Sequence, residues 1–358
     1  MVWILAIESF YFTIQRHSQR NRTNRLINIL FAITWPSPQS CLEVNRRLSS
    51  EFKSMKPMIN HFLKLLVLCV LAQSLSAADP RVLIIVGPST HPPGSHEVAA
   101  GGRLMKHCVE NMNNLPGIKA EIVEGWPGKE LRDEASTVVF IGDFFPPNRL
   151  PNAAQNLAAL EAMMNRGCGI VCVHYANGVH GDDVTPEGDH PLLRWIGGYF
   201  ANRSCKHHES FAKIFTSATI TPTDPQHAIT YGVKEFTLHD EPYYNNYFGP
   251  GNRMAANVKS LATSMLPPDN PKPETVAWCI ERPDNGRGFG IVMPHFYKNW
   301  RDENLRRFIL NGIVWTAKLE VPTEGIQTTP PILEDFTPRS VEYPSPPPKS
   351  SNESKRPN

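Results

Sequence analysis

The chain has 358 residues, of which 41% are hydrophobic and 20% charged, enough apolar material for a large folded domain. Its formal net charge is +2, but residues 1–78 hold 9 of the 36 basic and 3 of the 34 acidic residues, so the remainder has 27 against 31, or −4. That remainder has no basic run of the kind that binds phosphate backbones, so we expect no nucleic-acid partner.

The first distinctive stretch is a short apolar run. Residues 61–78 have a weakly basic start, an apolar core too short to span a bilayer, and small residues at the end, a pattern typical of a secretory signal peptide. We therefore predict a signal peptide at 55–78, with residues 1–54 a spurious or a disordered extension. The mature protein is then expected to be secreted or periplasmic, with no stable membrane span.

In residues 79–175, apolar runs alternate with helical patterns. Runs at 81–87, 120–124, 137–142 and 169–173 predict buried strands. Helical spacing predicts one helix capped by Ser95, with an apolar face from Val98 to Met112, and another over 151–166. This alternation predicts a doubly wound α/β domain with a mostly parallel sheet and helices on both faces.

The second half of the domain has less regular patterns. We predict strands over 208–215, 236–239, 258–265, 275–280 and 288–293, a short helix at 191–198, a surface loop at 266–273 and a last helix at 302–317. Residues 321–358 contain nine prolines in 38 residues and few large apolar side chains, so they are predicted to be a disordered tail. The domain itself is placed at 79–320.

Titratable side chains follow four of the apolar runs. They are His91 and His96, His174, Asp240 and Glu241, and His295. If these runs are neighbouring parallel strands, their carboxyl ends meet at one rim and form a pocket. Such a pocket suits acid/base chemistry, or a divalent metal such as zinc as cofactor. The alternative is that each histidine is an ordinary loop or core residue bonded to a carbonyl.

The cysteines do not indicate covalent chemistry. The five beyond residue 78 form no short paired spacing, so we predict buried apolar side chains rather than disulfides. Cys172 lies near the position of a glutaminase nucleophile, but Ile170 and His174 stand where that strained turn has glycines. Cys172 is therefore predicted to lie inside a strand.

Taken together, several stretches resemble the trehalose-utilisation (ThuA-like) family, a flavodoxin-like branch of the class I glutamine amidotransferase-like superfamily. They are residues 91–97, 169–176, 195–200, 227–233, 240–244, 281–290, 295–296 and 311–315. The resemblance implies a flavodoxin-like domain without the Cys-His-Glu triad, a link to sugar metabolism, and a pocket built from His96, His174, Glu241 and His295. Two stretches depart from the family pattern, Met293-Pro294 and residues 202–206, and the second bears on substrate identity.

These features predict an enzyme that acts on a sugar or sugar derivative by hydrolysis, elimination or isomerisation, with a small sugar as its partner. His174, His295, Glu241 and Asp240 are the predicted catalytic residues, and His96, His174 and His295 the predicted metal ligands. The alternative is a carbohydrate-binding module without catalysis. Its sugar-stacking rings would be Trp126, Trp278, Trp300, Tyr243, Tyr244 and Tyr247.

Overall fold

The computed structural model describes residues 80–337 and 339. The predicted signal peptide and the extension before it lie outside these residues. Within them, no helix is long and apolar enough to cross a membrane.

The central element is a nine-stranded sheet in the order β2-β1-β3-β4-β11-β10-β9-β7-β8. Its strands are β1 (Arg81–Val86), β2 (Lys119–Glu124), β3 (Thr137–Ile141), β4 (Gly169–Val173), β7 (Phe215–Pro222), β8 (Phe236–Asp240), β9 (Val258–Leu266), β10 (Lys272–Glu281) and β11 (Arg287–Ile291). A separate parallel pair joins β5 (Gly178–Val179) to β6 (Phe200–Ala201).

The first five strands of that order pair in parallel and the remaining pairs are antiparallel. The parallel half has the 2-1-3-4-5 order of flavodoxin-like folds, so the predicted fold class is confirmed. The side chains of β3 and β4 are buried at every position, as expected of strands covered on both faces.

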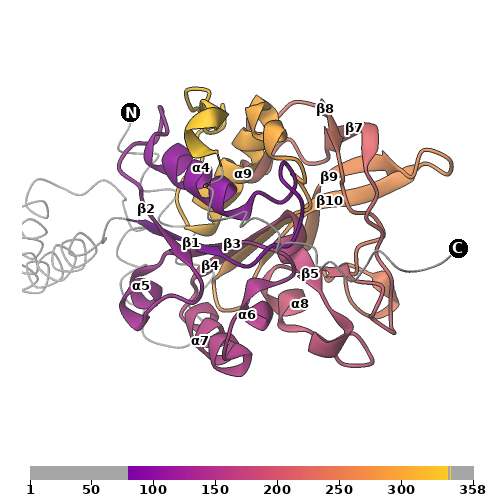
Figure 1. The fold of residues 1–358 in the computed structure, drawn as a ribbon. Helices are drawn as coiled ribbons and strands as arrows, with labels where there is room; N and C mark the ends of the chain where they lie inside the picture. Colours follow the sequence, from indigo (N-terminus) through magenta and orange to yellow (C-terminus); the bar gives the residue numbers. More distant parts are fainter. Residues whose placement is uncertain (1–79, 338, 340–358) are drawn as a thin grey trace, which may run out of the picture. The chain divides into compact units, whose positions relative to one another are not determined.

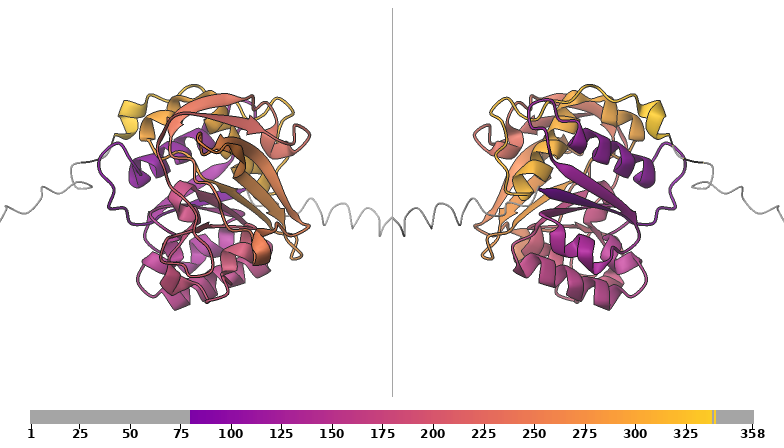
Figure 2. Two further views of the ribbon diagram at one scale, coloured as in Figure 1. Left: turned by 90° about the vertical axis from the view of Figure 1, so that its right-hand side faces the viewer. Right: turned by 90° about the vertical axis from the view of Figure 1, so that its left-hand side faces the viewer.

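Helices cover both faces of the sheet (Figure 1). They are α4 (Val98–Glu110), α5 (Lys129–Glu134), α6 (Pro146–Arg149), α7 (Ala153–Asn165), α8 (Pro191–Trp195) and α9 (Glu303–Thr316). Helices α4 and α9 lie on one face and α5 to α8 on the other, and the two side views in Figure 2 show the same layers. Helix α9 begins after Asp302, whose carboxylate caps the Leu305 amide.

Two predicted features differ from the structure, and one short helix is not predicted. Ser95 does not cap α4, whose N-cap is Glu97, but forms a β-bridge with Phe296. The strand predicted at 208–215 begins only at Phe215 and continues to Pro222; residues 209–212 line a cavity, and Phe211 forms an isolated bridge with Tyr244. Helix α5 was not predicted, since it buries no side chain and therefore has no apolar face.

The tail predicted to be disordered from residue 321 is in part packed against the domain. Val321, Ile326 and Leu333 are buried, and Leu333–Phe336 forms the 3₁₀ helix η6. The Asn113 amide donates to the Gln327 carbonyl, which attaches this segment beyond the end of α4. The prediction of disorder is therefore wrong for this part of the segment. It rested on the proline content, whereas three spaced aliphatic side chains are enough to pack the segment against the domain.

Candidate metal centre

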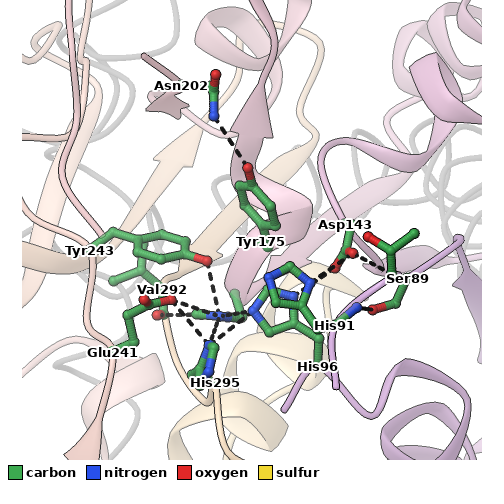
Figure 3. A network of polar contacts seen from close by, with 12 residues as sticks. Ser89, His91, His96, Asp143, Tyr175, Asn202, Glu241, Tyr243, Val292 and His295 are labelled. Atoms are coloured by element: carbon green, nitrogen blue, oxygen red, sulfur yellow. Dashed lines mark hydrogen bonds and ion pairs between the residues drawn. The ribbon is translucent and has the colours of Figure 1, made fainter. Parts of the chain in front are cut away.

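Three histidines from the loops after parallel strands meet at one point. Figure 3 labels two of them, His96 and His295, together with Glu241. His174 follows β4 directly, His295 comes four residues after β11, and His96 lies between β1 and α4. The carboxyl ends of β1, β4 and β11 face the same rim because these strands share one direction in the sheet. The predicted convergence of these side chains is therefore what the structure shows.

The three imidazoles turn one nitrogen each toward a common centre. His174 Nε2 lies 2.9 Å from His96 Nε2 and 3.3 Å from His295 Nδ1, and the last two nitrogens are 3.0 Å apart. Glu241 Oε2 lies 3.1 Å from His295 Nδ1 and 4.0 Å from His174 Nε2. Four candidate ligand atoms thus lie within 4.8 Å of one another. We call these residues the His₃Glu cluster.

The other ring nitrogens determine which tautomers are present. His174 Nδ1 is 2.9 Å from the Val292 carbonyl oxygen, which can only accept, so Nδ1 carries the proton. His96 Nδ1 is 2.6 Å from Asp143 Oδ1, a carboxylate that likewise accepts. Both Nε2 atoms therefore point lone pairs at each other across 2.9 Å. A metal ion between them makes this arrangement favourable, and the alternatives are an added proton or neutral donors such as the Tyr243 hydroxyl, which lies 3.0 Å from His174 Nε2.

Burial argues against the added proton. The side chains of His174 and His96 are 4% and 2% exposed. Loss of solvation lowers the pKa of His174 well below 6.5, and the neighbouring His96 and His295 lower it further. Burial also lowers the pKa of His96, although Asp143 opposes that shift. The two imidazoles are therefore held neutral, the form that binds metals.

The backbone at two of these histidines is strained. His96 has φ of 44° and His174 has φ of 50°, both in the left-handed region that costs a residue with a Cβ about 1 kcal/mol or more. His174 sits where β4 turns into the 3₁₀ helix η1 (His174–Asn177), the sharp strand-to-helix turn that exposes a nucleophile in related folds. Backbone strain of this kind is typical of functional sites, where it fixes the direction of a side chain, here the two imidazoles that point to the common centre.

Asn177 holds that turn in place. Its Nδ2 lies within hydrogen-bonding distance of the carbonyls of Cys172, His174 and Ile291, at 3.1, 2.9 and 3.0 Å. One fully buried amide thereby links the end of β4, the turn and β11. The sequence alone did not single out this residue, because its importance lies in contacts with distant backbone.

Asp240 and Glu241 are adjacent in sequence but act differently. Glu241 faces the cluster, whereas Asp240 Oδ1 accepts from the amides of His295 and Phe296, at 2.9 and 3.2 Å. Asp240 is fully buried, and that burial raises its pKa to about 6. The structure therefore corrects the catalytic role predicted for Asp240: this residue positions the His295 loop and does not face the pocket.

Asp143, at the end of β3, is a further functional residue that the prediction did not include among the site residues. Its Oδ1 binds His96 Nδ1, and its Oδ2 lies 2.9 Å from His91 Nδ1. These bonds to His91 and His96 keep the pKa of Asp143 far below its usual range. The carboxylate–histidine pair is the usual outer support of a metal-bound imidazole. Its position directly after a predicted strand was the available signal.

His91 and Tyr243 complete the surroundings of the cluster. His91 stacks on His96 with ring centroids 3.5 Å apart, and its pKa is raised chiefly by the hydrogen bond to Asp143. Tyr243 stacks on His174, and its hydroxyl lies 3.0 Å from His174 Nε2. Burial raises the pKa of Tyr243 well above its ordinary value, so the hydroxyl keeps its proton.

Other predicted features have structural roles. Trp278, Trp300, Tyr243 and Tyr247 are at most 5% exposed, so they do not present ring faces for sugar stacking. The five cysteines are free and buried as predicted, and Cys172 lies inside β4. Burial raises the pKa of the Cys172 thiol, which makes it a poor nucleophile.

The donor set fits a divalent metal ion. Three imidazole nitrogens and one carboxylate oxygen are ligands that zinc and related ions accept. Outer hydrogen bonds orient His96 and His174, as metal sites require. His91, His96 and Asp143 form a second group of candidate ligands. Its 2.6 and 2.9 Å contacts are those of hydrogen bonds, so we interpret it as outer support.

Comparison with known proteins places the chain among relatives of low similarity. The family model ThuA, described as trehalose utilisation, matches residues 125–316. A ThuA-like protein from Bacteroides uniformis has 15% identity and a TM-score of 0.48, with coverage of 67% of this chain and 93% of the other. A carbohydrate deacetylase has 13% identity and a TM-score of 0.41, covering 67% and 32%. A Thermotoga maritima glutamine amidotransferase has 9% identity and a TM-score of 0.39, covering 67% and 99%. No curated protein matches significantly.

Proposed function

The chain belongs to the ThuA family, whose model is described as trehalose utilisation, and on that premise we propose that it is a metal-dependent enzyme acting on a carbohydrate. The observation that carries the proposal is the pair of Nε2 lone pairs, on His96 and His174, that face each other at 2.9 Å. A divalent ion bound there would act as a Lewis acid toward a carbonyl, hydroxyl or water oxygen.

The residues around the cluster supply hydrogen bonds and proton transfer. Tyr243 offers a protonated hydroxyl beside the ligand nitrogen of His174, placed to donate to an oxygen that gains charge. His91 lines the cavity next to the cluster and is oriented by Asp143, so its imidazole is available as an acid or base. Hydrolysis, elimination and isomerisation of a sugar all need a polarised oxygen and a proton carrier.

The alternative of a non-catalytic carbohydrate-binding module has less support. It depended on aromatic rings open to solvent, and most of those rings are buried in the core. It also gives no reason to bury three imidazoles against one another. We therefore keep it only as an outcome of the test.

The test compares metal content and turnover in two matched variants. Elemental analysis of the purified protein is expected to find about one divalent ion per chain, removable by a chelator. His174→Ala should lose the ion and turnover of a sugar panel, while His227→Ala, a control at another buried histidine, should keep the ion. Sugar binding without product formation, unaffected by the chelator, would instead identify a binding module.

We also propose that the mature protein is secreted or periplasmic. This rests on the apolar segment at 55–78 and lies outside the described residues. N-terminal sequencing of the exported protein should find a start near Asp79. A start near Met1 in protein retained by the cell would contradict it.

A further inference from the structure

A cavity of about 340 Å³ opens beside the His₃Glu cluster. Its inner wall is formed by Glu241, Tyr243 and His91, and Tyr175 and Phe200 extend the wall away from the cluster. Residues 202–203 and 209–212, from the long connection between β6 and β7, complete it. The volume is within the range of small-molecule sites, and a ligand in it would lie next to the candidate metal ligands.

Arg203 is the one Lys or Arg among the described residues that line this cavity. Its side chain is exposed and has no hydrogen bond or ion pair within residues 80–337, where arginines such as Arg149, Arg282 and Arg301 are paired with carboxylates. The positive charge of Arg203 lowers the pKa of the Tyr175 hydroxyl, a contribution opposite to that of burial. A guanidinium with no hydrogen-bond or ion-pair partner in the described part of the chain is thus available to a ligand.

The same cavity offers separate partners for hydroxyl groups. The Glu209 carboxylate, which only accepts, also lines it. The Tyr175 hydroxyl accepts from Asn202 Nδ2 at 3.4 Å and keeps its own proton to donate, because burial raises its pKa. A ligand that satisfies these groups carries hydroxyls toward Glu209 and Tyr175 and an oxyanion toward Arg203. A guanidinium binds a carboxylate or phosphate through two parallel N–H bonds, which a single neutral hydroxyl cannot match.

We propose that this cavity is the substrate subsite and that it selects a carbohydrate bearing an oxyanion, with Arg203 as the specificity-determining residue. The inference rests on the proposed function, since it assumes that the cluster acts on a molecule held in this cavity. It goes further by stating the charge of the substrate. The oxyanion is a carboxylate or a phosphate, and the test separates the two.

The test measures binding of three matched probes by calorimetry or ligand-observed NMR: glucose, glucuronate and glucose 6-phosphate. At least one of the anionic probes should bind about tenfold or more tightly than glucose, and rising salt should reduce that difference. Arg203→Gln should abolish the preference, because the affinity for the anionic probe falls to about that for glucose in the same variant. Lys206→Gln, which removes an equal charge from an exposed residue of the same loop, should keep the preference.

Equal binding of glucose and both anionic probes would overturn the inference, as would an unchanged preference in Arg203→Gln or no binding of any probe. The measurement is made on both metal-free and metal-loaded protein. If the protein binds no metal but still prefers the anionic probe through Arg203, the proposed function is refuted and this inference stands. A metal-dependent enzyme that does not discriminate by charge would refute this inference alone.

Discussion

At the level of single residues, the cluster depends on side chains that do not touch the central point. Asp143 orients His96, the Val292 carbonyl orients His174, and Asp240 holds the His295 loop by two backbone amides. Each of these contacts selects a ring position or a tautomer. Removing one should therefore weaken metal binding without removing a ligand.

Asp143→Asn tests the first of these supports. An amide accepts more weakly than a carboxylate and can present a donor to His96 Nδ1, so the tautomer is no longer fixed. Metal affinity, measured by competition with a chelating dye, should fall about 10- to 100-fold. Asp182→Asn, at a side chain that is 90% exposed, serves as the control and should have no effect. Unchanged affinity in the Asp143 variant would contradict the proposed orientation of His96.

Asp240 provides a test by pH. Its pKa is raised from 3.8 to about 6, so the folded state holds a proton that the unfolded state has lost across this interval. Its contribution to stability is present below pH 3.8 and lost as the pH rises through about 6, in total about 3 kcal/mol. The metal-free wild type should therefore lose this stability between pH 3.8 and 7, whereas Asp240→Asn should not. The difference in unfolding free energy, variant minus wild type, should rise by the same amount over this interval. A pH-independent difference would show that Asp240 is not a buried titrating group.

At the level of elements, the packed segment after α9 and the strand predicted at 208–215 are the features that differ most from the sequence prediction. Periodicity predicted the parallel strands and the last helix, because buried strands and amphipathic helices have distinct apolar spacing. It also placed three histidines at strand ends. The antiparallel pairing of β7 with β8, the Asn177 bonds and the docking of residues 321–337 depend on contacts between distant segments, which local spacing does not encode.

Asn177→Ala removes the donor to three buried carbonyls at the turn between β4 and η1. The amide has two N–H groups to share among these carbonyls, and each buried acceptor without a partner costs about 1 kcal/mol or more, so the variant should lose about 2 kcal/mol of unfolding free energy in urea denaturation. Its metal affinity should fall as well, because His174 loses its fixed position. Asn257→Ala removes one exposed side-chain bond to a carbonyl and should cost less than about 1 kcal/mol. Equal effects in the two variants would refute the bracing role.

Ile326→Ala tests whether the segment after α9 is docked. Ile326 is 2% exposed, so the substitution should cost about 3 kcal/mol of unfolding free energy. Ile332→Ala, in the same segment but 63% exposed, should cost less than about 0.5 kcal/mol. Two equally neutral substitutions would mean that the original expectation of a disordered tail was correct.

For the molecule as a whole, the parallel half of the sheet brings the histidine loops together, and the antiparallel half extends it to β8 and Glu241. A flavodoxin-like domain thus keeps the strand-to-helix turn at β4 with His174 at its apex and Cys172 enclosed in the strand. Sequence resemblance identified the family and predicted four pocket residues, which the structure brings close together. The sequence does not indicate that Arg203 and Glu209 line a cavity together with Glu241. That arrangement depends on how residues 202–212 pack in the folded chain.

The central claim is that the His₃Glu cluster holds a metal ion. Its most direct test is a crystal structure of the protein saturated with zinc, with anomalous data collected on both sides of the zinc absorption edge. We predict one strong anomalous peak about 2.1 Å from the Nε2 atoms of His96 and His174 and from Nδ1 of His295, with Glu241 as fourth protein ligand. No peak among these three nitrogens at saturating zinc would contradict the account.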